Sequence, residues 1–211
     1  MAAEVITSLE NLNLSQPVVF CIVDLETTGL DPYKDEIIEI YILKYRQWGQ
    51  LECFHSFVKC QGGVSERITK INGITQEKLD KEGREPAEVY AEVREFLVDT
   101  VLIAHNGKRF DFPFLEESFK KAGIEPPTSP QLDSMLLAKY LMPGLKSYAL
   151  EALLEENNIT YERRELHSAR YDASCLAKLW KDWEQRLINT GLDPFLAEDL
   201  KNLNEHLEEN F

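Results

Sequence analysis

Two acidic residues near the N-terminus offer the first chemistry in the chain. Residues 18–23 are apolar, with β-branched and aromatic side chains, and predict a buried strand that leads into Asp24 and Glu26. Because side chains alternate along a strand, these two carboxylates point the same way, repel each other and lose hydration. Two interpretations follow: a site for Mg²⁺ or Mn²⁺, or a strand end that opens into a solvated turn at Gly29 and Asp31.

Two further aspartates stand where a charge is costly. Asp111 lies just past a second apolar run, residues 101–104, and its structural alternative is the N-cap of a helix. Asp172 belongs to the apolar face of a long predicted helix, where an unpaired charge is expensive. Its alternative is a buried ion pair with Arg170 or Lys146, which accounts for it less well than a shared metal ion.

A histidine stands close to one of these acids. His167 lies five residues before Asp172, at or just before the start of the same helix. Many histidines in such places are partly exposed and have no role. Here the spacing brings an imidazole within reach of whatever Asp172 holds, where a neutral ring can act as a general base. By contrast, Asp133 is assigned to a helix cap.

Three segments, in order, resemble the exonuclease motifs of the DnaQ-like (DEDDh) 3′–5′ exonuclease family. They are VDLETTGL at 23–30, AHN at 104–106 with Phe110-Asp111 after it, and HSARYDA at 167–173. The similarity spans roughly residues 18–185 and is closest to the proofreading epsilon subunit of DNA polymerase III and its stand-alone relatives. The segment INGIT at 71–75 resembles a connector in which a histidine often replaces Asn72.

The resemblance implies a ribonuclease H-like fold and hydrolysis with two Mg²⁺ or Mn²⁺ ions. Asp24 would bridge both ions, Glu26 and Asp172 would complete one site, Asp111 would support the other, and His167 would take a proton from the attacking water. The last nucleotide of the substrate would lie along seven residues: Thr27, Thr28, Gly29, Leu30, His105, Asn106 and Phe110. Phe110 suits core packing equally well.

The expected function is a 3′–5′ exonuclease that releases nucleoside monophosphates from the 3′ ends of single-stranded DNA or RNA, with DNA preferred. Its expected partner is a polymerase or another replication or repair protein. The alternative from a different class is a non-catalytic module that binds nucleic acid or a polymerase through the same fold. The four acids and the histidine are all present, which favours the enzyme.

Composition limits the class of protein. The 211 residues are 44% hydrophobic and 28% charged, as expected for one globular domain. The formal net charge of −14 argues against unaided binding to long duplex nucleic acid, although bound divalent ions would invert the local field. There is no membrane-length apolar run, no signal peptide and no metal spacing among the four cysteines. We therefore expect no membrane association and a cytoplasmic protein, or a nuclear one in a eukaryote.

The elements that must position the acids follow from the apolar patterns. Strands at 36–45 and 51–59 continue the first strand into an antiparallel meander, and the later helices and short strands predict an α/β fold with a mixed central sheet flanked by helices. We expect a flexible segment at 1–16, an exonuclease domain at 17–190 and a helical tail at 191–211. The tail has a leucine stripe at 196, 200, 203 and 207 that starts at Asp193-Pro194. Docking of this stripe on the chain's own core is favoured over an interface with a partner, and the oligomeric state stays open.

Overall fold

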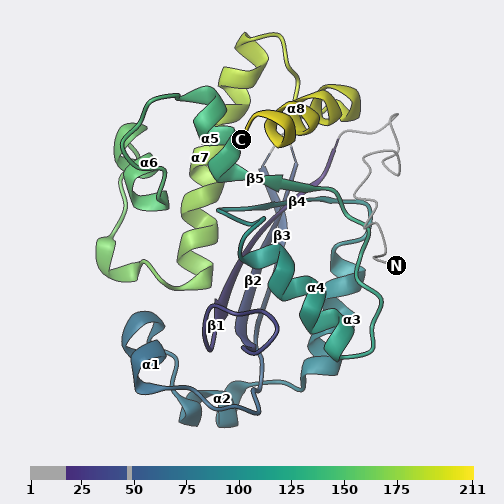
Figure 1. Ribbon diagram of the computed structural model, residues 1–211, viewed down its shortest axis with the longest axis vertical. Helices are drawn as coiled ribbons and strands as arrows, with labels where there is room; N and C mark the ends of the chain where they lie inside the picture. Colours follow the sequence, from purple (N-terminus) through teal and green to yellow (C-terminus); the bar gives the residue numbers. More distant parts are fainter. Residues whose placement is uncertain (1–17, 47–48) are drawn as a thin grey trace.

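The computed structural model describes residues 18–46 and 49–211. A five-stranded sheet occupies the centre, in the order β3-β2-β1-β4-β5 (Figure 1). Strands β1 (Phe20–Thr27), β2 (Ile37–Arg46) and β3 (Gly49–Phe57) form the antiparallel meander, while β4 (Val101–Ala104) and β5 (Gln131–Asp133) run parallel to β1. The mixed sheet with its meander is thus confirmed. The segment predicted to be flexible, 1–16, lies outside the described residues.

Helices pack on both faces of the sheet. The described chain contains α1 (Glu66–Asn72), α2 (Gln76–Glu82), α3 (Pro86–Phe96), α4 (Asp111–Lys121), α5 (Ser134–Leu141), α6 (Leu150–Glu156), α7 (Ala169–Asn189) and α8 (Ala197–Asn210), with a short 3₁₀ turn at Arg163–Glu165. Figure 1 shows α3 and α4 on one side, α5, α6 and α7 on the other, and α1 and α2 beyond the end of β1. No helix in the described ranges is long and apolar enough to cross a membrane.

Strand alternation in β1 decides which face receives which side chain. Cys21, Val23 and Leu25 pack into the core under α3 and α4, whereas Phe20 and Ile22 pack into the core under α7. The period of two therefore directs the next residues of the second series, Asp24 and Glu26, to the face that α7 covers.

Helix α7 is the longest described, with 21 residues. Its apolar face includes Leu176, Trp180 and Trp183, all buried, and the Trp180 ring lies 4.7 Å from the ring of Phe20. Burying two tryptophans and several leucines fixes both the position and the rotation of the helix on the sheet. This packing places the first turn of α7, with Asp172, above β1.

The C-terminal helix begins later than the sequence predicts. Asp193 does not cap it: its Oδ1 accepts a hydrogen bond from the backbone N–H of Phe195 at 3.0 Å, which closes a turn, and the helix starts at Ala197. Phe195 is buried against Phe20, with the ring centroids 5.7 Å apart. Three leucines of the predicted stripe, at 200, 203 and 207, are buried in the core under α7, whereas Leu196 is 54% exposed. In this structure three of the four leucines of the stripe are therefore covered by the chain's own core.

Two helices were not predicted from the sequence. Both α1 and α2 have only seven residues, too few for a clear helical period. Local capping marks them instead: Ser65 accepts from the N–H of Ile68, and Thr75 accepts from that of Lys78.

Candidate active site

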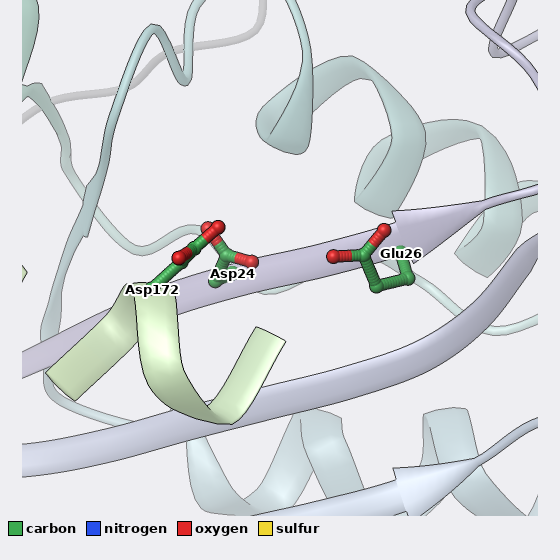
Figure 2. A group of neighbouring side chains, drawn as sticks. All are labelled: Asp24, Glu26 and Asp172. Carbon is green, nitrogen blue, oxygen red and sulfur yellow. The ribbon is translucent and has the colours of Figure 1, made fainter. Parts of the chain in front are cut away.

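Three carboxylates from two elements meet on the α7 face of the sheet. Asp24 and Glu26 lie on β1, and Asp172 lies on the first turn of α7. One oxygen of each lies within 4.8 Å of the others, and Figure 2 shows the three carboxylates turned toward a shared space. This geometry brings together three of the four acids predicted for the site, and their roles remain a proposal.

The fourth acid reaches the cluster from the other layer. Asp111 is the first residue of α4, 4% exposed, and its negative charge is the largest charge effect on Asp24. The N-cap of α4 is Phe110, so the cap alternative for Asp111 is wrong. Asp133 does cap its helix, as predicted, because its Oδ1 accepts from the N–H of Met135 at 2.8 Å.

Burial and mutual repulsion disfavour the charged forms of these acids. Loss of hydration is the main cause in each case. It raises the pKa of Glu26 to about 8, that of Asp111 to about 8 and that of Asp172 to about 6. The pKa of Asp24 is raised well above its ordinary value by burial and then by the charges of Asp111 and Asp172. Part of the cluster therefore holds protons near neutral pH unless a cation replaces them.

The donor set suits a hard divalent cation. Carboxylate oxygens are the ligands that Mg²⁺ and Mn²⁺ prefer. Within the described ranges Asp172 Oδ1 is buried without a hydrogen-bond partner, and its carboxylate forms no salt bridge with Arg170 or Lys146. The ion-pair alternative for Asp172 is therefore wrong, and one of its oxygens is buried with no hydrogen-bond partner among the described residues.

His167 contacts the cluster through its backbone. Its N–H donates to Asp172 Oδ2 at 3.1 Å, and its φ of +67° turns the chain sharply before Ser168, the N-cap of α7. The residue is exposed. The structure thus fixes the main chain of His167 beside Asp172, and the role of the imidazole stays a prediction.

At the end of β1 and in the loop after it, the groups predicted to contact substrate mostly form hydrogen bonds within the loop. The hydroxyl of Thr27 donates to the carbonyl of Gly29 at 2.5 Å, and that of Thr28 accepts from the N–H of Glu36 at 2.9 Å. A Cβ on Gly29 would collide with the carboxylate of Asp35, which explains the glycine. Leu30 is 79% exposed and is the residue of this group most available to a ligand.

The second predicted substrate segment, after β4, is also largely engaged. His105 pairs through Nδ1 with Ser134 Oγ at 3.0 Å, and burial lowers its pKa. Asn106 adopts a left-handed φ of +58° at the turn. The ring of Phe110 lies 4.9 Å from that of Phe114, at the margin of the core under α3 and α4. The packing alternative for Phe110 is therefore observed in this structure.

Two residues beside Glu26 were missed as members of the site. Glu39 on β2 lies directly opposite Glu26 in the strand pair, is buried, and binds His55 Nε2 at 2.8 Å. Asn72, at the end of α1, donates from Nδ2 to Glu26 Oε2 at 3.2 Å. The register that pairs Glu39 with Glu26, and the approach of α1 to β1, cannot be read from spacing along the chain.

Comparison with known proteins identifies the family. The RNase_T family model, described as an exonuclease, matches residues 21–180, which is most of the chain. The chain belongs to this exonuclease family. The predicted relationship to DnaQ-like exonucleases is thus confirmed, and this chain is an exonuclease domain by descent.

Curated relatives of this exonuclease domain include PolC-type DNA polymerases III. The protein from Mycoplasma genitalium is 32% identical over 202 residues, which cover 96% of this chain and 14% of the relative. The protein from Thermotoga maritima is 34% identical over 188 residues, which cover 89% of this chain and 13% of the relative. The chain thus spans about one-seventh of the length of these relatives.

Solved structures establish the fold. A crystal structure of E. coli Exonuclease I in complex with a dT13 oligonucleotide matches with a TM-score of 0.72 at 20% identity, and the match covers 82% of this chain and 42% of that chain. At this level of identity the likeness concerns the fold alone. The predicted ribonuclease H-like fold is confirmed.

Proposed function

We propose that this exonuclease domain is a metal-dependent 3′–5′ exonuclease that releases nucleoside monophosphates from single-stranded nucleic acid. The observation that carries the proposal is the convergence of Asp24, Glu26 and Asp172 within 4.8 Å, with a buried oxygen of Asp172 that has no partner in the described chain. Such a cluster is costly for the protein alone and becomes favourable when divalent cations offset its charge.

In this proposal the four acids, Asp24, Glu26, Asp111 and Asp172, hold two Mg²⁺ or Mn²⁺ ions. When bound, such ions activate water and stabilise charge on the attacking and leaving oxygens of a phosphodiester. His167 accepts the proton of the attacking water through its exposed side chain, and Asp172 fixes the adjoining backbone. Leu30 lies against the terminal nucleotide.

DNA is the preferred substrate in this proposal, and a DNA polymerase is the partner. The PolC-type relatives are DNA polymerases, and E. coli Exonuclease I was crystallised with a DNA oligonucleotide. These bacterial relatives also support a cytoplasmic location. Digestion of matched DNA and RNA oligonucleotides tests the preference: faster release from RNA would reverse it, because discrimination depends on how the site meets the 2′-hydroxyl.

The metal requirement is tested with Asp24→Asn, which keeps the shape of the side chain and removes its charge. We expect nucleotide release in Mg²⁺ to fall about 10³-fold or more, because the amide of the variant lacks the negative charge with which the Asp24 carboxylate would hold a cation. Circular dichroism should show the same fold. The control Glu95→Gln changes an exposed acid on α3, across the sheet, and should leave the rate unchanged.

Two outcomes would contradict the proposal. Full release in excess EDTA would remove metal from the reaction. An unaltered chain that binds single strands in Mg²⁺ without releasing nucleotides would favour the alternative of a non-catalytic binding module.

A further inference from the structure

The amide of Asn72 is oriented by contacts at both of its ends. Its Oδ1 accepts a hydrogen bond from the backbone N–H of Ile74 at 3.0 Å, and its Nδ2 donates to Glu26 Oε2 at 3.2 Å. An N–H group can only face an acceptor, so the oxygen of the amide must face Ile74. The NH₂ group is therefore the end that faces the carboxylate of Glu26.

The end of α1 is built so that this amide has little freedom. Gly73 takes a left-handed φ of +74°, and its N–H bonds the carbonyl of Thr69 at 2.9 Å. The hydroxyl of Thr69 donates to the carbonyl of Ile74 at 2.8 Å. Ile74 is 2% exposed and packs with Ile38 and Leu79. A helix end, a side-chain bond and a buried apolar anchor thus hold the turn that carries Asn72.

Glu26 needs a donor at this place because its charged neighbours are acids. Asp111 and Asp172 act on it from other elements, and Glu39 lies opposite it on β2. The carboxylate of Glu39 is already bound by His55. Among the described residues, the side-chain donor that faces the Glu26 carboxylate is the NH₂ group of Asn72.

We propose that Asn72 is a positioning residue for Glu26: it fixes one carboxylate oxygen and leaves the other for the cation shared with Asp24 and Asp172. The inference rests on the proposed metal site, but it concerns a residue outside that ligand set. A neutral amide serves this purpose because it binds an ionised carboxylate without competing for the cation. Partners of metal ligands typically change metal affinity or activity by about 10–100-fold when they are removed.

The test uses Asn72→Ser, which keeps an acceptor for the N–H of Ile74 but is too short to reach Glu26. Calorimetric titration with Mn²⁺ should show affinity reduced by about 10–100-fold, and kcat at limiting metal should fall while KM for a short oligonucleotide is unchanged. Asn72→His should restore both values, because a neutral imidazole offers one donor and one acceptor. Ser65→Ala is the matched control. It loses the hydrogen bond that caps the opposite end of α1, so Mn²⁺ affinity should stay within about two-fold.

A double-mutant cycle separates positioning from a general effect on the fold. In the Glu26→Gln background, Asn72→Ser should change Mn²⁺ affinity by less than about two-fold, since its partner is already altered. Equal losses in Asn72→Ser and Ser65→Ala, or an undiminished loss in the Glu26→Gln background, would overturn the inference and leave the proposed function intact. If the unaltered chain binds no Mn²⁺, both are overturned.

Discussion

Asp24, Glu26 and Asp172 illustrate the cost of placing several acids on one strand and one helix turn. Each loses hydration on folding, the charge of Asp172 raises the pKa of both Asp24 and Glu26, and the charge of Glu26 raises that of Asp24. A raised pKa in the folded state means that the protein binds protons more tightly than the unfolded chain, so stability falls as pH rises through that pKa. Cations bound to the folded state would offset this loss.

The role of His167 is the prediction that belongs to a single residue. We expect His167→Ala to reduce nucleotide release by about 10²–10⁴-fold, the usual effect of losing a general base. Mn²⁺ affinity should change only a few-fold, because the acids hold the cation and the backbone N–H that binds Asp172 is still present.

Single-turnover kinetics at one pH, with calorimetry alongside, would check both the rate and the Mn²⁺ affinity expected for His167→Ala. The exposed His206 on α8, replaced by alanine, is the matched control. Loss of metal binding in His167→Ala would make this residue a ligand or a structural element. An unchanged rate of nucleotide release would remove it from the mechanism.

At the scale of elements, α7 carries two acids in unlike settings. Asp172 faces the cluster, whereas Glu184 lies in the core with 7% exposure. The hydroxyl of Tyr45 donates to Glu184 Oε2 at 3.3 Å, and Oε1 has no partner in the described chain. Burial raises the pKa of Glu184 to about 7. Packing of α7 on β2 should therefore weaken as this carboxyl ionises.

The sign of that effect can be tested with Glu184→Gln. Because the folded pKa of about 7 exceeds the ordinary value, the stability contributed by the neutral carboxyl is present at pH 5 and is lost as pH rises past 7. The neutral amide does not ionise, so the variant should be about 1–3 kcal/mol more stable than the unaltered chain at pH 9 and close to it at pH 5. Urea unfolding in EDTA at both pH values measures this, with exposed Glu156→Gln as the control. Equal pH dependence in the two variants would contradict the prediction.

Sequence predicted the elements whose signal is local. The period of two in β1 and the long apolar face of α7 are enough to bring Asp24, Glu26 and Asp172 to the same layer. The contact between Asn72 and Glu26 joins residues 46 positions apart and depends on how two seven-residue helices follow the meander. The predicted start of α8 was wrong because Asp193 can close a turn as readily as it can cap a helix.

At the scale of the whole molecule, the negative net charge of the chain repels an anionic substrate. The formal net charge is −14, and single strands are anionic. Of the basic residues near the motifs, Lys108 is paired with Glu208, Arg163 with Glu151 and Arg164 with Glu165. The salt bridge of Lys108 joins the loop before α4 to α8, so an acid of the C-terminal helix neutralises one of the basic residues near the motifs.

The remaining exposed cations near the motifs are Arg109, Lys146 and Arg170, which have no salt bridge among the described residues. About three phosphate contacts on a single strand predict a slope near −2 for the logarithm of affinity against the logarithm of salt concentration. Digestion should be distributive, because a strand held by so few contacts dissociates after each cleavage.

Arg109→Gln should reduce the slope by about 0.7, whereas Arg94→Gln on α3, across the sheet, should not change it. Binding titrations and product-length analysis over a salt series measure both properties, and processive digestion of long strands that is insensitive to salt would contradict this account of the charge distribution.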